Sequence, residues 1–75
     1  MQVDKYNLDF ILNAKRTSSD EIRKHLIEFA DNIEVSTLAD DEFKIILQAE
    51  DPTIIFDTCA QFGRIRSVKV NECSS

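Results

Sequence analysis

Residues 6–26, YNLDFILNAKRTSSDEIRKHL, contain one change of hydrophobic period, and this change decides the fold. The first half has a period of two, in which Asn7, Asp9, Ile11 and Asn13 separate the apolar residues Tyr6, Leu8, Phe10 and Leu12. This alternation predicts a half-buried strand. Apolar residues then recur at intervals of four, three and four, which predicts a helix with one apolar face. They are Ile22, Leu26, Phe29 and Ile33.

The link between this strand and this helix allows two interpretations. Ser18 and Glu21 have the spacing of a capping box, in which the Ser18 hydroxyl accepts from the Glu21 amide. The alternative is an anion site, because the free amides and the dipole of a helix N-terminus attract negative charge. Acidic residues in the same first turn and the absence of glycine favour the cap. The residues of the alternative anion site are Lys15, Arg16, Ser18 and Ser19.

The rest of the chain repeats these signals. Two strands are expected at 33–38 and 43–49, joined by an acidic turn, and a last short strand at 64–70. Asp51-Pro52 begins a second helix, and Gly63 suits the C′ position that ends it. The residues expected to be most buried are Leu8, Phe10, Leu26, Phe29, Ile45, Leu47, Ile55, Phe62 and Val68.

The order strand, helix, strand, strand, helix, strand predicts an α+β fold. With right-handed crossovers it gives the ferredoxin-like βαββαβ sandwich, a four-stranded antiparallel sheet in the order 4-1-3-2 with two helices on one face. The 75 residues are expected to form a single domain, 1–75, with a core at about 5–71 and a flexible tail at 72–75.

Composition excludes several classes of function. Nine Lys and Arg against fourteen Asp and Glu give a net charge of −5, which opposes binding to nucleic acid or to an anionic membrane. The apolar runs are too short to span a bilayer, and the N-terminus lacks the pattern of a signal peptide. Cys59 and Cys73 do not have the spacing of a disulfide framework or a zinc site. We therefore expect a cytoplasmic protein.

No residue pattern indicates catalysis, and we expect no enzyme, no metal and no cofactor. His25 has no second histidine or cysteine near it in the sequence and is expected to be a packing residue. Cys59 lies in a helical pattern and has no adjacent base. A nucleophile requires such a base, so we do not expect Cys59 to be one. The turn at 40–42 is acidic but lacks the alternate ligands and the glycine of a calcium loop.

The sheet face opposite the helices is the predicted interface. Strand alternation directs Ile11 and Ile46 to this face, with Lys44 and Gln48 beside them. An apolar centre with a charged rim is the usual anatomy of a modest interface. Ile27 and Phe56, which lie off the apolar faces of their helices, could form a second patch.

The closing stretch FGRIRSVKV, residues 62–70, resembles the end of ACT-like regulatory domains. This resemblance implies a regulatory or partner-binding module that acts through association or by binding a small effector, with a protein partner or a homodimer. Two alternatives stay open. One is an acylphosphatase-like enzyme or anion-binding domain that uses the first strand–helix loop. The other is an acidic decoy or antitoxin-like binder of a basic partner.

Overall fold

The computed structural model describes residues 5–73. Six elements follow one another, and their order is that expected from the sequence. They are β1 (Lys5–Ala14), α1 (Ser19–Leu26), β2 (Ala30–Ala39), β3 (Glu42–Ala49), α2 (Pro52–Ala60) and β4 (Gly63–Cys73). β4 includes Glu72 and Cys73, which the sequence analysis assigned to a tail, and residues 74–75 of that tail lie outside the described residues.

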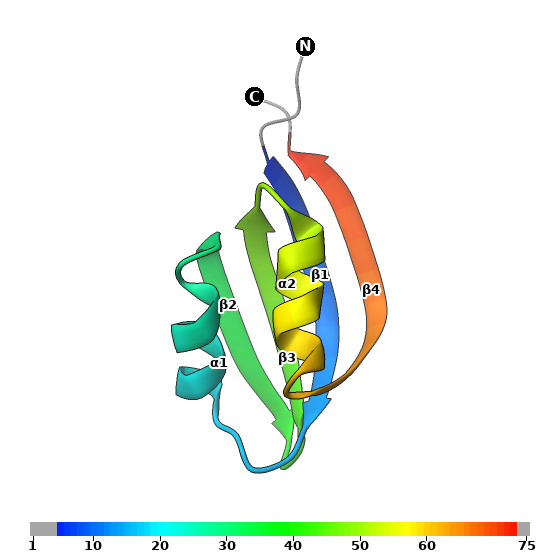
Figure 1. Cartoon of the computed structure of the whole chain (residues 1–75). Coiled ribbons are helices and arrows are strands. Elements are labelled where there is room, and N and C mark those ends of the chain that lie inside the picture. Colours follow the sequence, from blue (N-terminus) through cyan, green and yellow to red (C-terminus); the bar gives the residue numbers. More distant parts are fainter. Residues whose placement is uncertain (1–4, 74–75) are drawn as a thin grey trace.

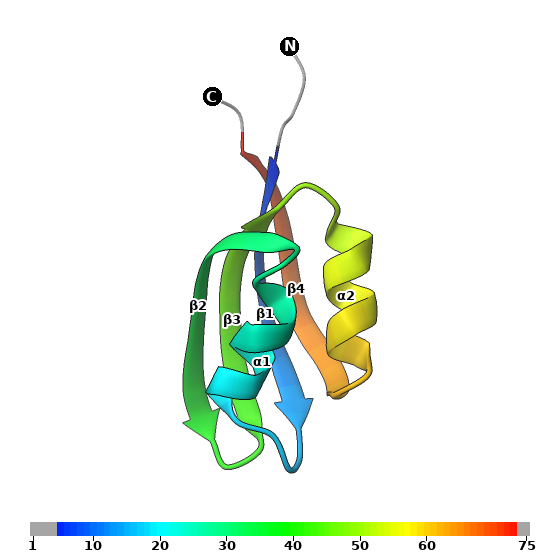
Figure 2. The same cartoon turned by 60° about the vertical axis from the view of Figure 1, so that its left-hand side comes forward.

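The four strands form one sheet in the order β2-β3-β1-β4, which is the expected order 4-1-3-2 counted from the other edge. Each neighbouring pair is antiparallel. Both helices lie on the same face of the sheet, α1 beside β2 and α2 beside β4 (Figure 1; Figure 2). The other face carries no helix, so the chain has two layers and one core between them.

The core lies between the sheet and the helices and is built by the alternation of the central strands. β1 and β3 each direct every second residue to the helices, and Leu8 pairs with Leu47 while Phe10 pairs with Ile45. Phe10 also contacts Phe56 of α2, edge to face, with ring centroids 5.4 Å apart. The fully buried large side chains are Leu8, Phe10, Leu12, Ile22, Leu26, Ile45, Leu47, Ile55 and Cys59.

Helix α1 is shorter than the apolar pattern predicts, and the expected burial of Phe29 is wrong. The helix ends at Leu26 with Ile27 as its C-cap, and Phe29 lies in the following turn with 44% of its surface exposed. Ile33, the fourth residue of the expected apolar face, lies in β2 and is partly buried there. The periodic spacing therefore continued through a turn, where helical geometry no longer directs side chains to one face.

Gly63 begins β4, and its role differs from the expected one. The residue does not have the positive φ of a glycine at C′, and Gln61 caps α2 in a right-handed conformation. Gly63 instead pairs with Ala14, and a Cβ on it would lie 1.9 Å from the Asn13 carbonyl oxygen. Glycine is required here because the two backbones approach too closely for any side chain.

The second half of β4 is exposed, so the expected burial of Val68 is also wrong. Val70 pairs with Leu8 and thus faces the helix layer, yet Val68 and Val70 are 47% and 46% exposed. β4 is the edge strand beside α2 (Figure 1), and Ile65 is the apolar residue of its first half that packs against the core. Phe62 itself is only partly buried, less than the sequence analysis expected.

Candidate functional site

A hollow of about 300 Å³ opens at the end of the sheet where β2 begins and β3 ends. It lies between the turn that follows α1 and the turn that precedes α2. Ala30 and Ala49, the first and last residues of these strands, are paired and line the hollow. Both side chains are single methyl groups and are buried at the base of the hollow.

Three large apolar side chains around this hollow are exposed. Ile27 and Phe29 come from the turn after α1, and Ile54 comes from the first turn of α2. Their exposed fractions are 63%, 44% and 39%. Single exposed apolar residues are ordinary on protein surfaces, but three around one hollow form a patch suited to contact with another molecule. We call this hollow with its apolar lining the helix-end notch.

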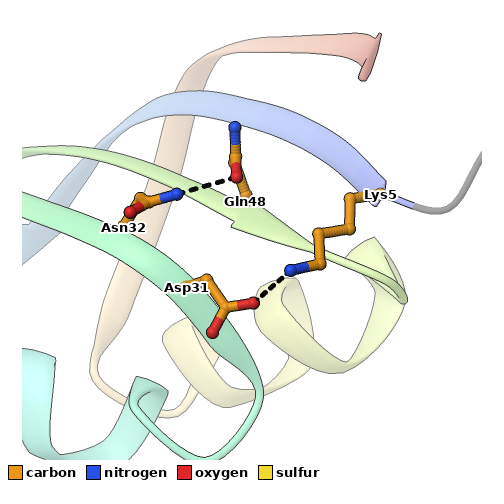
Figure 3. A network of polar contacts seen from close by, with 4 residues as sticks. All are labelled: Lys5, Asp31, Asn32 and Gln48. Carbon is orange, nitrogen blue, oxygen red and sulfur yellow. Dashed lines mark hydrogen bonds and ion pairs between the residues drawn. The ribbon is translucent and has the colours of Figure 1, made fainter. Parts of the chain in front are cut away.

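The rim of the helix-end notch is acidic. It carries Glu28, Asp31, Glu50 and Asp51. Asp31 pairs with Lys5 of β1 (Figure 3). The Asp51 side chain accepts from the Thr53 amide at 3.0 Å. Within residues 5–73, the side chains of Glu28 and Glu50 make no ion pair or hydrogen bond. Two carboxylates therefore stay available beside the apolar lining.

Sequence reasoning found only part of this site. Ile27 was expected in a patch with Phe56, but the Phe56 ring packs against Phe10 in the core. Phe29 was assigned to the core because of its spacing, and Ile54 was not singled out. The signal that could have revealed the site is the pair of alanines at the start of β2 and at the end of β3, Ala30 and Ala49.

The helix-free face of the sheet is crossed by polar contacts. Asn32 of β2 donates to Gln48 of β3 at 2.9 Å, and Lys5 of β1 reaches across β3 to Asp31 of β2 (Figure 3). Gln48, an expected interface residue, therefore belongs to a network that ties three strands together.

Two further ion pairs bear on the expected apolar centre of this face. Asp9 lies opposite Ile46, and Ile11 lies opposite Lys44, so these four residues form a square on the helix-free face. One diagonal of the square joins Asp9 to Lys44, and the other joins Ile11 to Ile46. The Lys44 ammonium lies 3.6 Å from the Asp9 carboxylate, so this ion pair follows the diagonal that crosses between the two isoleucines. The second ion pair, between Glu42 of β3 and Arg66 of β4, spans β1 on the other side of Ile11.

These ion pairs change the character of the expected interface. Ile46 is 38% exposed, whereas Ile11 is only partly exposed. Both residues lie on the helix-free face as expected, but a salt bridge runs between them. The role of this face as an interface stays a prediction.

The first loop contains the expected helix cap. Ser18 is the N-cap of α1, and its hydroxyl accepts from the Glu21 amide at 3.3 Å. The Glu21 carboxylate lies 3.6 Å from His25, one turn along the helix. Arg16 has a φ of 62°, a left-handed conformation that is unusual for a residue with a side chain. The cap interpretation of Ser18 is confirmed.

The expected anion-site residues divide into two groups. Lys15 lines a wide, shallow depression of about 800 Å³ together with Arg64 and Arg66 of β4. Arg16, Ser18 and Ser19 do not line this depression. The cations that share this depression with Lys15 are Arg64 and Arg66, and sequence reasoning connected neither with this loop.

Two further side chains with chemical reactivity are half-exposed His25 and buried Cys59. The His25 ring contacts the Phe62 ring edge to face, with centroids 5.0 Å apart. Cys59 is fully buried, and burial raises the pKa of its thiol to about 12. In residues 5–73, no three His, Cys, Asp or Glu side chains form a group that could hold a metal ion.

Comparison with known proteins gives no relative: no family model matches the chain, and no curated protein matches it significantly. Neither helix of the described residues is long and apolar enough to cross a membrane.

Proposed function

We propose that this protein is a non-enzymatic, partner-binding module that acts through association. Its element order and strand order support a ferredoxin-like fold, and we propose an ACT-like regulatory role in the cytoplasm. The observation that carries the proposal is the helix-end notch, where Ile27, Phe29 and Ile54 leave large apolar surfaces in water around one hollow.

The energetics of these side chains support association. Covering apolar surface stabilises a complex by roughly 25 cal/mol for each Å² removed from water. An exposed aromatic residue next to a hollow is the type of group that dominates binding energy at protein interfaces. The groups beside this lining are exposed carboxylates, which suit the rim of an interface.

A peptide selection tests the proposal. A random library of displayed dodecapeptides is selected on the full chain, and each selected peptide is tested against Phe29→Ser and a matched control, Leu38→Ser. Leu38 is exposed to a similar degree but does not line the notch. We expect peptides whose affinity falls about tenfold or more with Phe29→Ser and is unchanged with Leu38→Ser. If no selected peptide depends on Phe29, the proposal is wrong.

Binding of the same peptides to a second variant shows whether the notch or the helix-free face is the association site. The double variant Ile11→Ser with Ile46→Ser should leave notch binding unchanged, because the two isoleucines do not line the notch. A loss of binding only in this double variant, with wild-type unfolding cooperativity, would assign association to the helix-free face instead.

Anion binding by the first loop is a second candidate function, favoured by one observation. Lys15 and Arg64 line the same depression, and within residues 5–73 neither side chain has an ion-pair or hydrogen-bond partner. Glu42 and Arg66 also line this depression and pair with each other, so Lys15 and Arg64 leave it with a net positive charge that would attract an anionic group. A phosphate titration, argued in the Discussion, tests this candidate.

A further inference from the structure

We infer that the helix-end notch binds a polypeptide segment in which a large apolar side chain is flanked by lysine or arginine. This inference rests on the proposed function and adds the chemistry of the partner. Three observations support it: the size of the hollow, its alanine-lined base, and the charge of its rim.

The size of the hollow favours a single anchoring side chain. Pockets that bind small molecules measure about 300–1,000 Å³ and enclose most of their ligand. The notch has about 300 Å³ and lies at the surface between two turns, with Ile27 largely in water. A Leu or Phe side chain can enter between Phe29 and Ile54, while the segment that carries it covers Ile27.

The charge of the rim selects the residues beside this anchor. Glu28 lies between Ile27 and Phe29 in sequence, and Glu50 follows Ala49, so both carboxylates adjoin the apolar lining. Neither has a partner within the described residues. None of the described residues that line the notch is lysine or arginine. Cations next to the anchor would find two unpaired carboxylates, whereas acidic residues would be repelled.

The charge of β4 is opposite to that of the notch rim. β4, at the opposite edge of the sheet from β2, carries Arg64, Arg66 and Lys69 and a single carboxylate, Glu72. Charge therefore differs between these two surfaces, and an arriving basic segment is repelled by β4 and attracted by the rim of the notch.

This difference in charge also defines the main alternative occupant. β4 of a second copy would present Arg64, Arg66 and Lys69 beside the exposed Val68 and Val70. A β4–notch contact joins two different surfaces, so it would produce rings or open chains of molecules. A two-fold dimer built from one self-complementary surface does not follow from such a contact, so we assign the notch to a different polypeptide.

The test uses two synthetic peptides, KKFLKK and EEFLEE, added to the isotopically labelled full chain. We expect KKFLKK to shift the backbone amide resonances of residues 27–31 and 49–54, except Pro52, and EEFLEE to leave them unchanged. The KKFLKK affinity should fall as salt is raised from 0.05 to 0.5 M, since the attraction is between exposed charges.

Charge-reversal variants locate the effect. Glu28→Lys with Glu50→Lys should weaken KKFLKK binding about tenfold or more and permit EEFLEE binding. The matched control is Glu34→Lys with Asp57→Lys, which changes the net charge equally at two exposed positions that do not line the notch. The control should keep the wild-type preference, apart from a small uniform loss.

Each contrary outcome is distinct. The inference is wrong if KKFLKK shifts no notch resonance, or if EEFLEE shifts them equally. If the library selection gives Phe29-dependent peptides without lysine or arginine, the inference fails while the proposed function stands. If no peptide depends on Phe29, the proposed function fails as well. A mass that rises with concentration, and stops rising with Glu28→Lys and Glu50→Lys, would make a second copy the occupant and overturn the assignment.

Discussion

Gly63 lies so close to Asn13 that the backbones of β4 and β1 leave no room for a side chain. An added Cβ would be 1.9 Å from the Asn13 carbonyl oxygen and 2.9 Å from the Ala14 Cα. Both neighbours are backbone atoms of a central strand, so neither can rotate away as a flexible side chain could.

We therefore expect Gly63→Ala to be strongly destabilising, by about 3 kcal/mol or more, as for other severe overpacking changes. Urea unfolding followed by circular dichroism measures this cost. Ala60→Gly, at the end of α2, is the control for the loss of stability at a nearby helix end and should cost about 1 kcal/mol or less. A fully stable Gly63→Ala variant would show that β4 can shift away from β1.

Phe29 and Phe10 should respond very differently to truncation. Phe10→Ala removes a fully buried ring that contacts Phe56, and it should cost about 3–5 kcal/mol. Phe29→Ala removes a ring that is 44% exposed in a turn, and it should cost less than half as much. Equal losses in urea midpoints would show that Phe29 is part of the core in solution.

The buried thiol of Cys59 should make stability depend on pH in alkaline solution. Its pKa is raised from 9.0 to about 12 by desolvation, so the folded protein keeps the thiol proton while the unfolded chain loses it. The stabilisation is complete below pH 9 and is lost as the pH rises towards 12, by up to about 1.4 kcal/mol per pH unit.

The measurement for Cys59 is a comparison of two slopes. Free energies of unfolding are determined from pH 8 to 11 for the wild type and for Cys59→Ala, which retains all other titrating groups. We expect a steeper decline in the wild type. Parallel slopes would contradict the raised pKa, whatever the difference in overall stability.

The fold could be predicted from the sequence because its signals are local and repeated. Alternation in 6–12 and 43–49 directed Leu8, Phe10, Ile45 and Leu47 to the core, where the structure confirms them. Two capping signals placed the starts of the helices correctly, at Ser18 and at Asp51. Short crossovers then limited the strand order to the observed one.

The errors lie where a periodic pattern continued without burial. Phe29 kept the helical spacing after α1 had ended, and Val68 kept the strand alternation on an edge strand, where it is 47% exposed. The notch was missed for a related reason. It depends on which strand ends are adjacent and on how small their residues are, and Ala30 and Ala49 are 19 positions apart in the sequence. Likewise, no local pattern connects Lys15 with Arg64.

The two interpretations of the first loop predict different effects of phosphate. Ser18 accepts from the Glu21 amide, so Ser18→Ala should cost about 1 kcal/mol in any buffer. Arg16 has a φ of 62°, and glycine adopts this conformation without steric cost, so Arg16→Gly should retain full stability or gain up to about 1 kcal/mol. This variant thus removes the cation without damaging the loop.

If the loop only caps α1, phosphate and chloride at equal ionic strength give the same melting temperature in wild type, Arg16→Gly and Lys15→Ala. A rise in melting temperature specific to phosphate, and lost in Lys15→Ala and Arg64→Ala, would establish an anion site at the depression on β4. Loss in Arg16→Gly alone would place the anion at the helix N-terminus, and hydrolysis of acetyl phosphate that disappears with Arg16 would make this loop catalytic and contradict the proposed non-enzymatic role.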